Sequence, residues 1–408
     1  MLVATISDGT YISLYRKDVK RETLLHLRKE EQFYCPACQR EVILKLGEKQ
    51  AWHFAHKKKE TCNDFLEGET PYHIEGKKLL YDWFMSQQLH VELEPYVPQI
   101  KQRPDLLVHI GERRLAIEFQ CAKIPHQIFM KRTKTYQDHS YIPIWILGGN
   151  QIQRIKTNLF QLNSFHWLFT LNPHDQKDHS QLIAFCPKNK IFIKLNNIIA
   201  LSANRSICTP TFHPLNKFFF HTIFQTTSVH TQSDTWLSTK RMWRTYRRHL
   251  SEAQHFLRSL YLNKGIPYTL FPSEAGVPVP FHEFIETPTY VWQSWILEMF
   301  VNQREKHSKF HFKLVKRAFQ ALVKKGVFHL RLLPLKKAGS ENAALKSYLL
   351  LLCELNVLLT KDGGDVFIKL NDVQMPKTFD KAIEMDKKVN KTVSLKNRSF
   401  FYLVDCDE

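Results

Sequence analysis

Two short apolar segments joined by a glycine turn constrain the fold of this chain more than any other feature. Residues 105–110 and 115–120 have the length and the apolar content of β-strands, and Gly111 lies between them. A tight turn at Gly111 would pair the two segments as an antiparallel hairpin. Asp105 opens the first segment and Glu118 lies near the end of the second, so this pairing predicts that the two carboxylates lie close together.

Two adjacent carboxylates provide the oxygen ligands that Mg²⁺ and Mn²⁺ prefer. A cation held there can polarise a phosphate and lower the pKa of a bound water, which phosphodiester hydrolysis requires. Acids at hairpin spacing are usually solvated, but Glu118 lies within an apolar run, where a carboxylate needs a cation, a donor or a proton. We therefore interpret Asp105 and Glu118 as the metal ligands of a nuclease, with the Phe119 carbonyl as a third candidate, in a notch open to solvent.

The segments around the hairpin predict a compact α/β domain. Thr70 and Pro71 are typical of a helix start, and an amphipathic segment continues from there to Met85. We further expect strands at 90–97, 105–110 and 114–120, a helix from Pro125 to about Asp138, and a buried strand at 142–147. This α-β-β-β-α-β order is that of restriction-endonuclease-like (PD-(D/E)XK) enzymes, whose two acids lie on the second and third strands.

Gln120 occupies the position where many enzymes of this fold carry lysine. Lysine can orient or activate the attacking water and offset charge, whereas glutamine can only form hydrogen bonds. Some restriction enzymes of this fold carry glutamine there, so Gln120 does not exclude cutting. Lys123, Lys131 and Lys134 are candidates for the missing cation, but we favour a solvated or phosphate-contacting role for them.

Supporting residues are expected on the two predicted helices. His73 and Lys77 share a helix face one turn apart, so His73 could reach the metal, although a capping or solvated role fits it equally. Arg132 and Tyr136 also share a face, where they could clamp a phosphate and buttress the acids or simply pack the helix on the sheet. The supporting candidates are Glu69, His73 and Glu75 on the first helix, and Arg132 and Tyr136 on the second.

A cluster of cysteine and histidine residues precedes this domain. The thiolates of Cys35 and Cys38, two residues apart, could grip one Zn²⁺. His53 and His56 follow with only two residues between them, which is shorter than the usual spacing, so Cys62 is an alternative ligand. The other interpretation is two buried cysteines and two surface histidines. We favour a structural zinc site, because small hairpins with little core need a metal.

The composition points to several domains and to polyanionic partners. The chain has 408 residues, with 58 Lys and Arg against 39 Asp and Glu, which gives a formal charge of +19. Such an excess favours partners such as nucleic acids, and the length allows two or three domains. We expect a zinc-finger-like β module at 1–65, a nuclease-like domain at 66–150, and a basic, mainly helical region at 151–408 that divides into two subdomains.

Residues 241–250 mix arginines with aromatic side chains. On a helix, Arg241, Arg244 and Arg248 line up on one side. Arginines contact phosphates and aromatic rings stack on bases, which suits single-stranded nucleic acid. The alternative is an amphipathic helix whose aromatics enter the core, and for the aromatics we favour it. The predicted DNA contacts are Arg103, Lys131, Arg241, Arg244, Arg247 and Arg248.

Two further patterns concern the ends of the chain. A helix at 345–355 followed by strands at 357–360 and 365–370 has the order of a winged-helix unit, which many small α+β modules share.

The first residues predict a hairpin around Asp8-Gly9 rather than a signal peptide, and the apolar cluster at 348–353 is too short to span a bilayer. Eight cysteines, several of them isolated, do not form a disulfide framework pattern. We therefore expect a cytoplasmic protein without membrane insertion.

Taken together, these motifs resemble the bacterial competence protein CoiA family. The similarity lies in the Asp8-Gly9 hairpin, Cys35-Pro36-x-Cys38, His53-Phe54-Ala55-His56, residues 69–80, Arg103-Pro104-Asp105, Ile117-Glu118-Phe119-Gln120, Arg132-Thr133-x-x-Tyr136 and Trp145-Ile146-Leu147, and more weakly in residues 272–278 and 292–295. The resemblance implies a role in natural transformation, with single-stranded DNA as substrate and a recombinase or DNA-uptake proteins as partners.

The leading hypothesis is a metal-dependent deoxyribonuclease that processes incoming DNA, with Mg²⁺ or Mn²⁺ at the acids and a structural Zn²⁺. The alternative is a non-catalytic DNA-binding recombination factor, in which Gln120 marks the loss of cutting. RNA processing is a third hypothesis, because both nucleic acids share the phosphate chemistry.

Overall fold

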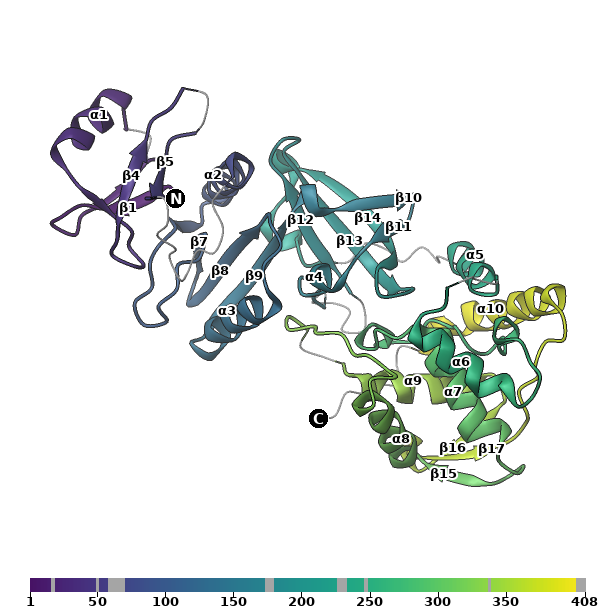
Figure 1. The fold of residues 1–408 in the computed structure, drawn as a ribbon. Coiled ribbons are helices and arrows are strands. Elements are labelled where there is room, and N and C mark those ends of the chain that lie inside the picture. Colours follow the sequence, from purple (N-terminus) through teal and green to yellow (C-terminus); the bar gives the residue numbers. More distant parts are fainter. Residues whose placement is uncertain are drawn as a thin grey trace. The chain divides into compact units, whose positions relative to one another are not determined.

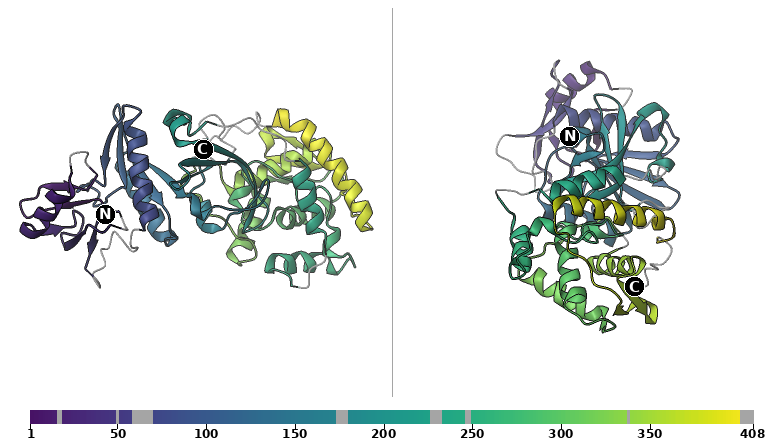
Figure 2. Two further views of the ribbon diagram at one scale, coloured as in Figure 1. Left: turned by 90° about the horizontal axis from the view of Figure 1, so that it is seen from above. Right: turned by 90° about the vertical axis from the view of Figure 1, so that its right-hand side faces the viewer.

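The structure, a computed structural model, describes residues 1–15, 19–48, 51–57, 70–172, 180–225, 233–245, 249–336 and 339–400. The chain divides into two compact units. Unit 1 comprises Met1–Ile152, Leu182–Lys194 and Thr211–Phe224, and unit 2 comprises Gln153–Gln181, Leu195–Pro210 and Gln225–Glu408. Figures 1 and 2 show the helices and strands of each unit. Within the described ranges, no helix combines the length and the apolar character needed to cross a membrane.

Unit 1 begins with a small five-stranded antiparallel sheet and one helix. The predicted hairpin around Asp8-Gly9 is confirmed, because Val3 pairs with Ser13 and Thr5 with Tyr11. A core that includes Leu24, Phe33 and Phe54 holds the sheet and the helix together. The elements are β1 (Val3–Thr5), β2 (Tyr11–Ser13), α1 (Arg21–Glu30), β3 (Phe33–Tyr34), β4 (Glu41–Lys45) and β5 (His53–His56), with the strand order β2-β1-β3-β4-β5.

The predicted α-β-β-β-α-β order of the next segment is confirmed. Its elements are α2 (Pro71–Met85), β6 (His90–Leu93), β7 (Leu106–Ile110), β8 (Arg113–Gln120), α3 (His126–Asp138) and β9 (Tyr141–Gly148). The strands β6, β7 and β8 are antiparallel neighbours, and β9 runs parallel to β8. As expected, the Thr70 hydroxyl caps α2, accepting a hydrogen bond from the His73 N–H at 3.3 Å.

One strand is shorter than predicted. The expected strand at 90–97 ends at Leu93, because Glu94 has a left-handed backbone (φ +49°) that a regular strand does not adopt. The hairpin between β7 and β8 turns at Gly111, whose φ of +56° favours glycine. Helix α2 contacts β6, β7 and β8, and α3 contacts β9, so the two helices pack on this sheet (Figure 1).

Unit 1 extends this sheet beyond residue 150. Strand β12 (Leu182–Cys186) runs parallel to β9, with Ala184 beside Leu147. Two longer strands, β13 (Ile191–Ala200) and β14 (Arg205–Pro214), contribute residues to both units.

Unit 2 is mainly helical, with a β-rich stretch near its start. A short helix α4 (Ser164–Trp167) accompanies β10 (Gln153–Lys156) and β11 (Leu159–Gln161), and β11 pairs with β14. The later elements are α5 (Ser233–Trp243), α6 (Glu252–Leu262), α7 (Thr289–Leu297), β15 (Lys309–His311), α8 (Phe312–Lys324), α9 (Glu341–Glu354), β16 (Leu358–Lys361), β17 (Val366–Lys369) and α10 (Phe379–Phe400). Trp292, Trp295 and Tyr348 lie in one core that joins these helices.

Candidate active site

The β7–β8 hairpin brings the two predicted acids to neighbouring positions. Leu106 pairs with Ile117, and extending this register by one residue places Asp105 opposite Glu118. The backbone N–H of Phe119 donates a hydrogen bond to Asp105 Oδ2 at 2.8 Å, so the aspartate is fixed against the strand that carries the glutamate. The turn residues and strand lengths thus position both acids as the hairpin predicts.

The site is more closed than expected. Asp105 is 8% exposed and Glu118 is 3% exposed, so the predicted notch open to solvent is wrong for this structure. The reason is that α2 packs on the hairpin and that side chains of α3 reach Glu118, so both carboxylates have charged and polar partners. A buried carboxylate needs such partners to offset the loss of hydration.

Helix α2 supplies the partners of Asp105. His73 Nε2 lies 3.3 Å from Asp105 Oδ2, and Lys77 Nζ lies 3.7 Å from Asp105 Oδ1. The close approach of α2 depends on Gly76, because a Cβ atom at that position would lie 1.9 Å from Cε1 of the Phe119 ring. The predicted face shared by His73 and Lys77 is therefore turned toward the hairpin.

A buried carboxylate that the sequence analysis missed, Glu94, anchors Lys77. The ammonium of Lys77 donates a hydrogen bond to Glu94 Oε1, and both side chains are almost fully buried. The other carboxylate oxygen, Oε2, accepts hydrogen bonds from the backbone N–H groups of Leu2 and Val3, with N···O distances of 2.9 and 3.3 Å. This glutamate thus connects the start of the chain to the candidate site.

The position of Arg103 corrects the prediction that it contacts DNA. The residue is 3% exposed, and its Nη1 lies 3.6 Å from Glu94 Oε2. Its guanidinium therefore balances the buried charge of Glu94 rather than facing solvent. No local sequence pattern indicates this role, because the turn that brings residues 94 and 103 together depends on the left-handed backbone at Glu94.

Helix α3 supplies the partners of Glu118. Arg132 Nη2 forms an ion pair with Glu118 Oε1, and the Tyr136 hydroxyl donates to the same oxygen at 2.5 Å. Burial raises the pKa of Glu118 to about 7, and the Asp105 charge adds to this increase, while Arg132 and Tyr136 oppose it. The two acids therefore have different partners: side chains of α2 contact Asp105, and side chains of α3 contact Glu118.

Two of the remaining predicted site residues, Gln120 and Glu75, are described by the structure. The Gln120 amide Nε2 donates to the Ala122 carbonyl at 2.8 Å. Glu75, a supporting candidate, is exposed on α2. Glu69 lies outside the described residues. Three lysines considered as the missing cation, Lys123, Lys131 and Lys134, are all exposed, so the cation beside Asp105 is Lys77.

The cysteine cluster forms at the turn between β3 and β4. The sulfur atoms of Cys35 and Cys38 and a ring nitrogen of His56, on β5, all lie within 4.8 Å of one another. Cys38 Sγ lies 3.3 Å from His56 Nε2. In the part of the chain that the structure describes, this is the one group of three or more His, Cys, Asp or Glu side chains with that geometry. His53 instead places Nδ1 2.9 Å from the Ala51 carbonyl, and Cys62 lies outside the described residues.

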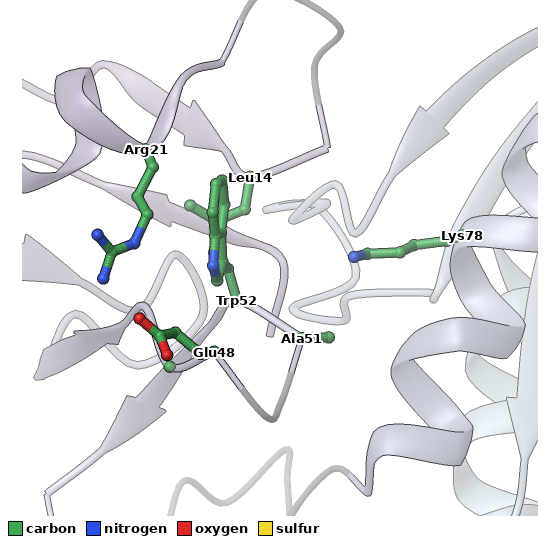
Figure 3. A pocket seen from close by; sticks show the side chains of 7 residues that line it. Leu14, Arg21, Glu48, Ala51, Trp52 and Lys78 are labelled. Atoms are coloured by element: carbon green, nitrogen blue, oxygen red, sulfur yellow. The ribbon is translucent and has the colours of Figure 1, made fainter.

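A separate hollow of about 550 Å³ lies in unit 1, lined by residues between Leu14 and Trp52 and by Lys78. Figure 3 shows the side chains of Arg21, Glu48 and Trp52 on one side of it, and Lys78 extending from α2 on the other. It contains none of the predicted site residues, so it plays no part in the candidate metal site.

Comparison with known proteins places these features in one family. Models of the competence protein CoiA match the N-terminal domain at residues 16–65, the nuclease-like domain at 69–228 and the C-terminal domain at 231–383. The chain is 31% identical to the competence protein CoiA of Bacillus subtilis (strain 168) over 332 residues, which covers 80% of this chain and 87% of that protein. The chain belongs to the CoiA competence family. No solved structure matches it significantly.

The CoiA nuclease-like domain contains the whole hairpin site. Its match runs to residue 228, past the boundary expected near residue 150, and unit 1 likewise includes Leu182–Lys194 and Thr211–Phe224. The CoiA N-terminal domain contains Cys35, Cys38 and His56.

In the CoiA C-terminal domain, the structure corrects the predicted role of Arg244. Its guanidinium is 2% exposed and binds both carboxylate oxygens of Asp386, at 2.7 and 2.8 Å. It also donates to the Phe271 carbonyl at 2.8 Å, so it is a structural cation rather than a DNA contact. Trp243 is buried, as the core alternative predicted, and Arg241 is exposed. Arg247 and Arg248 lie outside the described residues.

Proposed function

We propose that this chain is a divalent-metal-dependent nuclease of the PD-(D/E)XK type that processes incoming DNA during natural transformation. The observation that carries the proposal is the arrangement of Asp105 and Glu118 on neighbouring strands, with a buried lysine beside the aspartate. The family model names this domain nuclease-like, and the similar Bacillus subtilis protein is named a competence protein, which supports the biological process.

The donor set fits a hard divalent cation. Asp105 and Glu118 would hold Mg²⁺ or Mn²⁺ through carboxylate oxygens, with the Phe119 carbonyl as a third ligand. Such a cation, when bound, lowers the pKa of a water and polarises the scissile phosphate. Glu118 must exchange its ion pair with Arg132 for the cation, which frees a guanidinium that can contact a phosphate oxygen. Arg132 and Tyr136 therefore fix the Glu118 carboxylate before the cation binds. Once the cation replaces them, they are available to contact the substrate.

Lys77 supplies the positive charge that Gln120 lacks. Its ammonium lies 3.7 Å from Asp105 Oδ1 and is held in place by Glu94. A fixed ammonium at this position offsets the charge on the attacked phosphate and orients the attacking water. Glu94 acts as a positioning residue, because it touches the lysine and not the reacting atoms.

The second part of the proposal is a structural zinc site. Cys35, Cys38 and His56 provide two thiolates and one imidazole, which is the donor chemistry of a tetrahedral Zn²⁺ site. Cys62 is the candidate fourth ligand that the sequence offers. Zinc would stabilise a module with short strands and a small core.

The test of the nuclease is a cleavage assay on the full chain. Single-stranded, duplex and branched DNA are incubated with Mg²⁺ or Mn²⁺, and products are separated by size. We expect Asp105→Asn and Glu118→Gln each to reduce cutting by more than about 100-fold, since even outer-shell partners of metal ligands contribute 10–100-fold. Asp138→Asn, an exposed acid on α3, is the matched control. Equal cutting by all four proteins would overturn the proposal, and competition with single-stranded RNA tests the substrate class.

One observation favours a non-catalytic alternative. Glu118 is bound by both Arg132 and Tyr136 and is almost fully buried, which a scaffold that no longer binds metal would also show. In that case the chain is a DNA-binding recombination factor with a nuclease fold. Tight DNA binding without cutting in any divalent metal would select this function.

A further inference from the structure

Helix α8 in unit 2 presents a continuous basic stripe to solvent. Lys313, Arg317, Gln320 and Lys324 are exposed and follow the i, i+4, i+7, i+11 spacing of one helix face. Val315 and Phe319, on the opposite face, are fully buried in the core. The stripe is therefore a defined face of a well-packed helix.

The charge of this region is unbalanced. Between residues 304 and 325 there are eight Lys or Arg and one acidic residue, Glu305. Across the described residues, no exposed basic side chain of this segment forms an ion pair with an acid. The exposed basic side chains are Lys306, Lys309, Lys313, Arg317, Lys324 and Lys325.

Helix α10 provides the contrast within the same unit. There, Lys381 and Lys388 are both paired with Glu384 at 2.8 Å, one turn away along the helix. Such pairs are the usual way to balance a surface helix, and like charges at the same spacing are mildly destabilising. Helix α8 has such like charges, and among the described residues its exposed basic side chains form no ion pair with an acid. This indicates that an external polyanion offsets the repulsion.

The neighbouring elements leave α8 as the accessible helix. The helix and two strands of the predicted winged-helix order are α9, β16 and β17; β15 and α8 precede them, and the sheet order is β15-β17-β16. Helix α9 is largely buried, with Tyr348 and Leu352 fully inaccessible, so it cannot enter a groove of a nucleic acid. Helix α8 contacts β15 and α9 (Figure 1), and Lys309 on β15 is exposed.

We propose that the α8 stripe, together with Lys309, is a second nucleic-acid-binding surface that grips the phosphate backbone without reading sequence. The side chains are cations and an amide, which bind phosphate oxygens, and the stripe contains no ring that could stack on a base. It spans roughly 16 Å at 1.5 Å per residue, enough for about five phosphates of one strand at 3.4 Å per nucleotide. The proposal rests on the proposed function only in taking DNA as the ligand.

DNA fits this stripe better than an acidic protein does. Protein interfaces depend on desolvated aromatic or aliphatic anchors at their centre, and the four stripe residues include no apolar side chain. A phosphate backbone needs only regularly spaced cations.

The test measures binding without cutting. The full chain and the variant Lys313→Gln/Arg317→Gln/Lys324→Gln are titrated onto a fluorescent 30-nucleotide single strand by anisotropy, in Ca²⁺ and at several salt concentrations. We expect affinity to fall about tenfold and the slope of log K against log salt to fall by about 2, or roughly 0.7 for each lost phosphate contact. The control variant, Lys381→Gln/Lys388→Gln on α10, removes two exposed charges that already have acidic partners and should bind as the parent does.

Unchanged affinity and salt slope in the stripe variant, with a circular dichroism melt like that of the parent, would overturn the proposal. Loss of binding to polyglutamate with DNA binding retained would assign the face to an acidic protein and would also overturn it. This binding experiment can fail or succeed independently of the proposed nuclease function, because it measures DNA binding by the stripe without DNA cleavage. If Asp105→Asn cuts DNA as the parent does while the stripe variant loses affinity, the nuclease assignment fails and the binding surface stands.

Discussion

At the scale of single residues, Lys77 is the centre of the candidate site. Its ammonium lies between two buried carboxylates, those of Glu94 and Asp105, and a third acid is held nearby on β8. A buried ion pair contributes little net stability, but removing one partner leaves an uncompensated charge that is costly. Lys77 is therefore required both for folding and for the chemistry, and a single substitution does not separate the two.

A double variant separates them. Lys77→Met alone should destabilise unit 1 by about 3–5 kcal/mol, because Glu94 loses its ammonium. Adding Glu94→Gln should recover part of this loss, because the single cation Arg103 then no longer has two buried carboxylates beside it, while DNA cleavage stays absent. Urea unfolding and the cleavage assay, run on the same preparations, check both parts. Cleavage restored together with stability would mean that Lys77 has a structural role only.

The sequence alone could predict some of these residues and not others. Asp105 and Glu118 follow from the strand pattern and the turn at Gly111, which are local features. Glu94 could not be predicted, because its role requires a left-handed backbone and the docking of Leu2 and Val3, which lie more than ninety positions earlier. The DNA contact predicted for Arg103 is wrong for the same reason, since its ion pair with Glu94 depends on that backbone turn.

At the scale of elements, the packing of α2 on β8 sets the site geometry. Gly76 allows the helix backbone to approach the Phe119 ring, and His73 and Lys77, one turn apart on the helix, both reach Asp105. The helix and the strands were predictable from their patterns, but the contact was not. Nothing in the helix pattern marks Gly76 as a packing position rather than a weak helix former.

Gly76→Ala tests this contact. The added Cβ would lie 1.9 Å from the ring of Phe119, which is buried, so the helix or the ring must move. We expect a loss of about 1–3 kcal/mol in unfolding free energy, as in other overpacked cores, and reduced cleavage. Gly47→Ala, where a Cβ meets no atom within 4 Å, is the control. Partial recovery of both properties in Gly76→Ala/Phe119→Leu would identify the clash as the cause.

In unit 2, Asp386 on α10 joins that helix to α5. It accepts two hydrogen bonds from Arg244 and lies 3.1 Å from Lys240 Nζ. Burial by itself would raise the pKa of Asp386, but the Arg244 hydrogen bonds and the Lys240 charge outweigh it and hold the pKa below its ordinary value of 3.8. The unfolded chain therefore binds this proton more readily than the folded chain does.

The sign of the resulting pH dependence follows from that shift. The contribution of Asp386 is fully present above pH 3.8 and is lost as the pH falls through the lower, folded value. At neutral pH, Asp386→Asn should destabilise unit 2 by about 3–5 kcal/mol, because Lys240 and Arg244 lose their counter-charge. Urea unfolding at pH 7 and pH 3 checks this, with the exposed Asp380→Asn as control. A difference from the parent chain that is the same at both pH values would contradict the assignment.

At the scale of the whole molecule, each unit combines a predicted feature with one that only the structure provides. In unit 1 the hairpin was predicted, and the network around Glu94 was not. In unit 2 the predicted arginine contact at Arg244 is replaced by a buried ion pair, and the basic face of α8 lies elsewhere in the same unit. The formal charge of +19 indicated a polyanionic partner but could not indicate which helix faces it.

The central claim is that Asp105 and Glu118 together hold a divalent cation. Anomalous scattering from a crystal of the full chain soaked in Mn²⁺ tests it most directly. A Mn²⁺ ion bound by both acids would give a peak roughly 2.0–2.6 Å from a carboxylate oxygen of each acid, with Glu118 drawn away from Arg132. A peak missing at saturating Mn²⁺, with Glu118 still paired to Arg132, would contradict it.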